Sequence, residues 1–228
     1  MNENIKNIGH EIKLSFTDNK GIIIFVSLFF LLSLIAGFLF ANELQSIIKP
    51  ALTVFQQKIT TGQVQLTTVS LYVNNITAAI VMYIGSFFLG ITGLMAIFVN
   101  ALLVGYYGSL YSAHSQLPLF LALLLPHGIF ELPALVLSCS GGLILLKFVI
   151  LFFKNLISPD YTFSDVFDPV YNSEDIDFKE KCKMSWRKNG KFVKHSLIIL
   201  VVSAVLLIIA AFVEANLTHR IASLFFNI

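Results

Sequence analysis

The sequence predicts an all-α integral membrane protein with five transmembrane helices, one re-entrant half-helix and amphipathic helices at the membrane surface. Two observations support this fold class. First, hydrophobic residues make up 57% of the 228 residues and charged residues only 12%, against about 25% charged in ordinary soluble domains. Second, the mean hydropathy is +0.83, and the apolar residues form long runs without charge. The net charge of +2 gives no overall basic field, so we expect membrane lipids as partners and no nucleic acid.

Four runs are read as single crossings, since about 20 apolar residues span the ~30 Å hydrocarbon core. These runs are residues 22–41, 69–93, 94–113 and 196–217. The first twenty residues are mixed in charge, and no small-residue cleavage site follows the first run. We therefore expect an uncleaved signal anchor rather than a removed signal peptide.

Three polar segments carry helical apolar faces. Residues 1–20 are predicted to form either a helix on the membrane surface or a frayed tail. The connector 42–68 is predicted to be helical, with Pro50 kinking or dividing it. In the loop 157–195, Phe178, Cys182 and Trp186 are spaced four apart within a strongly basic stretch. This spacing predicts an amphipathic helix, which either anchors on anionic headgroups or docks a cytosolic partner.

The segment 117–156 is 40 residues of nearly unbroken apolar sequence, long enough for two crossings. Basic residues mark cytoplasmic segments, which places both the N-terminus and the loop 157–195 inside. The segment then crosses only once, so we expect residues 118–127 to form a re-entrant half-helix and 129–154 to form the span. The predicted break lies at Pro126, Gly128 and Pro133. The C-terminal residues 218–228 are then external; a six-span alternative would put the basic loop outside.

Glu131 is the only charged residue between Lys58 and Lys147. If a helix begins near residue 128, the Glu131 carboxylate lies in its first turn, where unpaired N–H groups and the helix dipole favour a negative charge. Intramembrane carboxylates are also frequently functional. Both a structural cap and a functional group therefore remain open.

We predict a polar intramembrane site that includes Glu131 and four further side chains, Asn74, Asn75, Asn100 and His127. Titration of His127 and Glu131 could carry a proton or an ion. The same pair is a weak candidate for metal ligation, because the sequence shows no evident third ligand. His114 is the nearest candidate for that third ligand. The sequence contains no nucleotide-binding loop and no nucleophile elbow, which argues against an enzyme. No cofactor is expected.

Small residues step by four along the run 94–113, at Ala101, Gly105, Ser109 and Ala113. Such stripes allow neighbouring helix backbones to approach closely. Because these stripes exceed what five helices need, we expect a homo-oligomer, with a dimer favoured. The two cysteines, Cys139 in an apolar run and Cys182 in a basic loop, are not expected to form a disulfide.

Asn74-Asn75 at the head of a span, Asn100 with Gly105 in the next span, and the stretch "PHGIFELPA" at residues 126–134 resemble the stage II sporulation protein M family. The resemblance covers roughly residues 22–217. The family pattern often has glycine at the position of Ala101. The resemblance implies a multi-span membrane protein that acts in endospore formers as an anchor beside envelope hydrolases during engulfment.

From these observations we expect a non-enzymatic membrane scaffold or anchor of the cell envelope, with an envelope protein as partner. The alternative is a transporter or channel for a small solute or ion, with its polar site at His127 and Glu131. A distant alternative is an intramembrane metal-dependent enzyme. A dry, packed centre would favour the scaffold, and a wet cavity reaching Glu131 would favour the transporter.

Overall fold

A computed structural model describes residues 3–60, 68–88, 90–157 and 177–226, and these residues are helical apart from short turns. The helices in chain order are α1 (Glu3–Thr17), α2 (Lys20–Leu39), α3 (Ala41–Thr60), α4 (Thr68–Phe87), α5 (Ile91–Ala113), α6 (Leu117–Ile157), α8 (Phe178–Asn189), α9 (Lys191–Val213), a π-helical turn η1 (Glu214–Thr218) and α10 (His219–Phe225).

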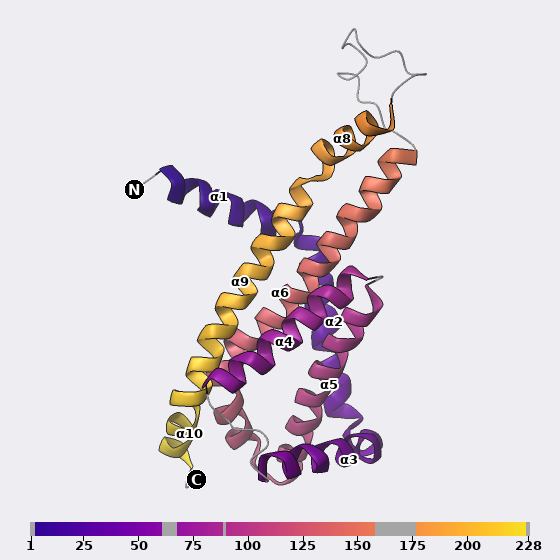
Figure 1. Ribbon diagram of the computed structural model, residues 1–228. Coiled ribbons are helices and arrows are strands. Elements are labelled where there is room, and N and C mark those ends of the chain that lie inside the picture. The colour runs from indigo at the N-terminus through magenta and orange to yellow at the C-terminus, as the bar shows by residue number, and fades with distance from the viewer. Residues whose placement is uncertain (1–2, 61–67, 89, 158–176, 227–228) are drawn as a thin grey trace.

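The long helices α6 and α9 lie side by side along the length of the molecule, and α2, α4 and α5 pack around them (Figure 1). Four described helical segments are long and apolar enough to cross a membrane: Lys20–Leu39, Ile91–Ala113, Leu117–Ile157 and Lys191–Phe225. The chain is thus a helical membrane protein. The expected fifth crossing corresponds to α4, which is not among these four.

Helix α6 corrects the prediction of a re-entrant element. It runs for 41 residues without interruption, with Pro126 and Pro133 inside it, and Gly128 does not adopt a positive φ. Each proline removes one intrahelical hydrogen bond, but transmembrane helices tolerate this where neighbouring groups satisfy the freed carbonyl. The expected break at these three residues is therefore wrong.

Residues 118–127, which were predicted to form the re-entrant half-helix, are part of α6. At 1.5 Å per residue, α6 extends over about 61 Å, roughly twice the hydrocarbon thickness. An unbroken helix can cross a bilayer only once. This geometry is incompatible with the six-span alternative, which requires two crossings from this segment.

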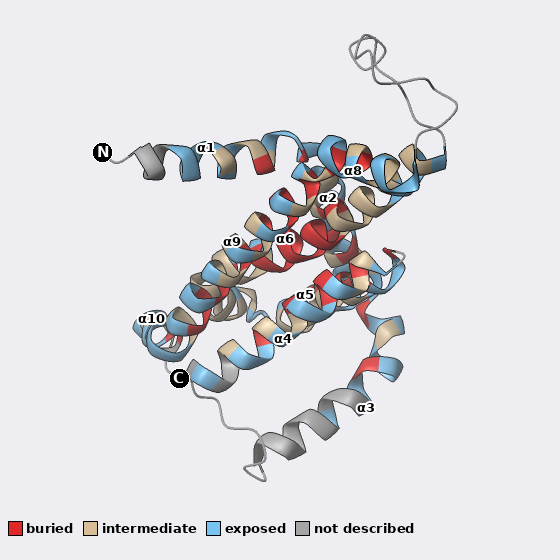
Figure 2. Ribbon diagram, turned by 45° about the horizontal axis from the view of Figure 1, so that its top comes forward, coloured by how far each residue is buried: buried red, intermediate tan, exposed pale blue. Residues whose placement is uncertain are grey.

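The centre of the bundle is the middle of α6. Every residue from Ala134 to Gly142 is buried, and this stretch is visible as the red band on α6 in Figure 2. Two of its residues bond directly to neighbouring helices. The Ser138 hydroxyl donates to the Ala79 carbonyl on α4 at 2.6 Å, and Ser203 on α9 donates to the Ala134 carbonyl at 2.7 Å. Hydroxyls that bond to backbone across helices stabilise packing where water is absent.

Glycines bring α2 and α5 into backbone contact. A Cβ added at Gly37 would overlap the Leu102 carbonyl oxygen, and one added at Gly105 would overlap the Leu34 carbonyl oxygen. Of the predicted small-residue stripe, Ala101 is fully buried, whereas Ala113 is exposed. The first half of the stripe therefore packs within the chain, and Ser109 is half-buried.

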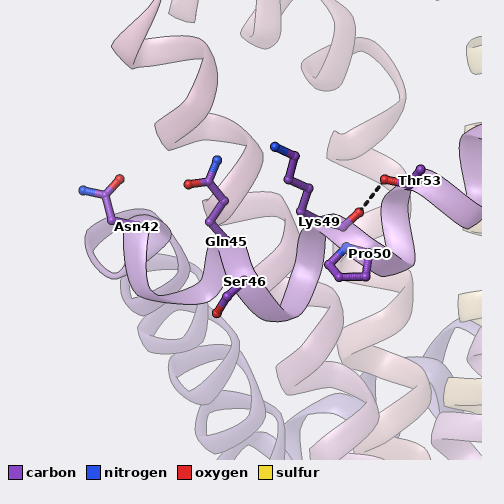
Figure 3. Close-up of a pocket in the computed structure, with 6 residues that line it drawn as sticks. All are labelled: Asn42, Gln45, Ser46, Lys49, Pro50 and Thr53. Carbon is purple, nitrogen blue, oxygen red and sulfur yellow. Dashed lines mark hydrogen bonds between the residues drawn. The ribbon is translucent and has the colours of Figure 1, made fainter.

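Helix α3 lies across one end of the bundle (Figure 1). Its apolar face packs against α5, where Ala41 and Ile48 form a small buried cluster with Tyr106. Pro50 lies inside α3 without dividing it. The opposite, polar face carries a shallow pocket of about 510 Å³ (Figure 3). Its lining residues are Asn42, Gln45, Ser46, Lys49, Pro50 and Thr53.

The N-terminal helix α1 projects sideways near the start of α9 in both views (Figures 1 and 2). Two exposed ion pairs join the segments: Lys194 to Glu11 at 2.9 Å and Lys191 to Asp18 at 3.0 Å. The hydrogen bonds from these lysines lower the pKa of both carboxyls. Beside them, Asn19 is buried and its amide lies 3.2 Å from His195 Nδ1.

Helix α8 begins at Phe178, directly after Asp177. The helix packs on the C-terminal part of α6 through Ser185, whose hydroxyl donates to the Phe152 carbonyl at 2.9 Å. The predicted apolar face points largely outward, since Phe178 is 70% and Trp186 56% exposed. Trp186 nevertheless touches Phe148 of α6 edge to face.

Candidate functional site

Three ionisable side chains from two helices converge near one end of the bundle. His127 and Glu131 come from α6, and Glu214 comes from the end of α9. One ligand atom from each lies within 4.8 Å of the other two. His127 Nε2 is 3.9 Å from Glu131 Oε2, and these two side chains are only 13% and 21% exposed. The site is thus one imidazole facing two carboxylates, largely shielded from the surroundings.

The continuity of α6 creates this pair. Residues four apart lie on one face of a helix, so an unbroken turn places His127 directly beside Glu131. Glu131 lies in the interior of α6, more than three turns from its first residue, Leu117. Its carboxylate therefore cannot cap a helix start, and the structural-cap interpretation is wrong.

The end of α9 supplies the other half of the site through an irregular turn. Residues Glu214–Thr218 form a π-helical turn between α9 and α10. Such single-turn bulges are rare and occur frequently at functional sites. The Thr218 hydroxyl donates to the Val213 carbonyl at 3.3 Å, and the same oxygen lies 3.3 Å from His127 Nδ1.

The tautomer of His127 depends on where the Thr218 hydroxyl donates its hydrogen. When this hydrogen goes to the Val213 carbonyl, the hydroxyl oxygen accepts from His127 and Nδ1 carries the proton. In the neutral ring, Nε2 then presents a lone pair toward Glu131. A lone pair and two carboxylates facing one another form a site that favours a cation or a shared proton.

The hydrogen bonds of the three predicted asparagines lie elsewhere than in this cluster. Asn100 donates to the Ala96 carbonyl of its own helix at 2.9 Å. Asn75 is buried, and its side-chain oxygen accepts from the exposed Asn74 at 3.4 Å. Helix α4, which carries this pair, packs against α6 and η1. His114 is exposed, and its Nδ1 lies 2.8 Å from the Leu110 carbonyl on α5.

Glu214 is the residue that sequence reasoning missed. It is the only charged residue between Lys194 and Arg220, inside the last apolar run. Glu131 is isolated in the same way between Lys58 and Lys147. A single carboxylate inside an apolar membrane helix costs free energy unless it has a partner. The presence of one isolated carboxylate in each of two apolar runs is therefore the sequence signal that could have placed Glu131 and Glu214 in one site.

The fold and the site define a helical membrane protein in which the long central helix α6 and the η1 turn after α9 hold an ionisable cluster between them. The chain belongs to the Stage II sporulation protein M family, whose family model matches residues 26–219.

Two archaeal relatives from Methanocaldococcus jannaschii are similar over most of their length. Uncharacterized protein MJ0706 is 31% identical, and the alignment covers 92% of this chain and 86% of the relative. Uncharacterized protein MJ0793 is 29% identical, with 88% of this chain and 96% of the relative covered. No solved structure matches the chain.

Proposed function

We propose that this protein is a non-enzymatic membrane scaffold of the cell envelope that positions partner proteins. The observation that carries the proposal is the packed centre. Nine consecutive residues of α6 are buried, from Ala134 to Gly142. A Cβ added at Gly142 would overlap the Tyr83 carbonyl oxygen. Close packing and direct backbone contacts suit a rigid anchor better than a passage for solute.

The same proposal includes an orientation. In it, α4 supplies a fifth crossing, the N-terminus and α8 are cytoplasmic, and the C-terminus is external. The basic residues of α8 support this orientation through the positive-inside rule. Phe178 and Trp186, exposed on α8, would then be available to the headgroup region or to a partner. We retain a homodimer in the proposal, although Gly37 and Gly105 already pack within one chain.

A transporter or channel is the second candidate, and the cluster of His127, Glu131 and Glu214 favours it. Partly shielded ionisable groups inside a membrane often lie along proton or ion pathways. The two candidates differ in whether water reaches the centre of α6. The first test variant is Ser138→Cys, at a fully buried position of α6, and the second is Leu125→Cys, at a position of α6 that is 51% exposed. Both would be made in a Cys139→Ser, Cys182→Ser background.

Each variant would be treated with a small water-soluble thiol reagent in intact membranes and again after denaturation. The scaffold predicts that the Ser138→Cys thiol reacts only after denaturation. Rapid reaction in native membranes would instead support an aqueous path and overturn the packed-anchor proposal. The Leu125→Cys position reports whether a lipid-facing thiol at a different depth also stays unreactive.

Recruitment of a partner is tested by site-specific photocrosslinking. A photoreactive phenylalanine analogue would replace Phe178, which is exposed, or Phe192, which is only 9% exposed. The scaffold predicts a discrete protein adduct from position 178 and none from position 192. Adducts with lipid alone at position 178, in cells that express the protein at its native level, would argue against recruitment through α8.

A further inference from the structure

We propose that His127, Glu131 and Glu214 bind one divalent transition-metal ion, with Zn²⁺ as the expected ion, and that this ion ties the η1 turn at the end of α9 to α6. The proposal concerns a binding site and does not depend on the scaffold function. It assigns the ion a structural role between two helices. It requires no catalytic step.

The donor set and its geometry suit such an ion. Imidazole nitrogen and carboxylate oxygen are both common Zn²⁺ ligands, with bonds of about 2.0–2.2 Å, so neighbouring ligand atoms in a tetrahedral site lie about 3.4 Å apart. The three candidate atoms lie within 4.8 Å of one another, and the His127–Glu131 pair is already at 3.9 Å. Small side-chain rotations would close the remaining distance.

The hydrogen bond on the far side of the imidazole is the second, independent observation. Metal-binding histidines usually donate their other ring N–H to an oxygen acceptor, which fixes the tautomer and aims the free nitrogen. Thr218 takes this position, with its oxygen 3.3 Å from His127 Nδ1 and its own hydrogen directed to Val213. Thr218 is itself buried, at 4% exposure. The ring is therefore oriented with Nε2 toward the two carboxylates.

Charge gives the site a reason to take up a cation. Two carboxylates whose oxygens lie within 4.8 Å of each other are both stabilised when a cation lies between them. A neutral His127 adds a nitrogen lone pair on the same side, which is a further donor for a metal ion. A divalent ion balances both negative charges at once and accepts the imidazole lone pair.

The π-helical turn explains how Glu214 reaches the site. It shifts the helical phase between Val213 and His219, and in the same turn Thr218 bonds to His127. A metal ion would couple this turn to α6. Binding should therefore stabilise the packing of α10 and η1 against α6, which the structure already places in contact.

Metal content is the first test. The full-length protein would be purified without a polyhistidine tag, stripped with a chelator, and titrated with Zn²⁺ alone by calorimetry in detergent. We expect about one Zn²⁺ per chain, abolished by Glu214→Gln. The matched control is Glu43→Gln, which removes an exposed carboxylate on α3 and should leave binding unchanged. Thr218→Val should weaken binding by about 10- to 100-fold, as loss of an orienting hydrogen bond does.

Two results would overturn the proposal: absence of stoichiometric binding in the wild type, or equal binding in the wild type and Glu214→Gln. A gain-of-signal variant covers the case in which Glu214→Gln fails to fold. His127→Cys loaded with Co²⁺ should show a thiolate-to-cobalt charge-transfer band that wild type lacks, although the wild type contains Cys139 and Cys182. Binding without that band would exclude residue 127 as a ligand.

Discussion

The backbone contact between α2 and α5 makes a sharp prediction for Gly105→Ala. The added Cβ would overlap the Leu34 carbonyl oxygen and lie 2.8 Å from the Phe38 nitrogen. Both obstacles are backbone atoms, so no side-chain rotation can relieve them, and the two helices must move apart. Overpacking of this kind costs about 1–3 kcal/mol, and we expect the upper end because the clash is with backbone.

A matched glycine isolates this cost. Gly21 lies in α2 with no heavy atom within 4 Å of a built Cβ, so Gly21→Ala should gain the helix-propensity difference of about 0.5–1 kcal/mol. Gly105→Ala gains the same amount and also incurs the clash. The free energies of unfolding of the two variants should therefore differ by about 3 kcal/mol, with Gly105→Ala the less stable.

The assay is equilibrium unfolding in mixed detergent micelles, followed by circular dichroism and by fluorescence. Gly37→Ala provides a second copy of the test, since its Cβ would overlap the Leu102 carbonyl oxygen at the same interface. The double variant should be less destabilised than the sum of the single variants, because one separation of the helices relieves both clashes. A difference between Gly105→Ala and Gly21→Ala below about 1 kcal/mol would refute the close contact.

Three further predictions follow from α6, α9 and α1. Pro126→Ala should stabilise the protein in the same unfolding assay by up to about 3 kcal/mol, because the residue lies inside a continuous helix; a clear loss of stability would favour a break at this position. Ser203→Ala removes the bond to the Ala134 carbonyl and should cost about 0.6–1.7 kcal/mol, whereas no change would show that the bond adds nothing. The pKa of Glu11, lowered below 4.5 by its bond to Lys194, implies that this ion pair helps hold α1 at neutral pH and weakens as the pH falls below about 4.5. The distance between spin labels on α1 and α9 should then increase on acidification, and Glu11→Gln should show a reduced dependence on pH.

The membrane character and most helix positions follow from the sequence because they depend on local composition. The expected runs 22–41 and 94–113 correspond to α2 and α5 within a few residues. The amphipathic connector forms α3, and its apolar face packs against a neighbouring helix, as its helical spacing of apolar residues predicts. The family also followed from short motifs, and the match over residues 26–219 confirms it.

The break in α6 was wrong for a physical reason. Proline and glycine weaken a helix locally, and sequence rules weigh only that local cost. In the folded bundle, residues 134–142 are held on several sides by α4 and α9. This packing favours a continuous helix strongly enough to override two prolines. The distribution of basic residues had indicated a single crossing for this segment, and that crossing stays a prediction.

The sequence by itself determined that Glu131 is an isolated carboxylate in a long apolar run and that His127 stands four residues before it. Only the tertiary structure decided what faces them. Glu214 is 83 positions further along the chain than Glu131 (214 minus 131), yet the antiparallel packing of α6 and α9 and the π-helical turn bring it into the same cluster. Spacing along one helix fixes which residues share a face, whereas the partner across the interface depends on how two helices pack, and no local pattern encodes that.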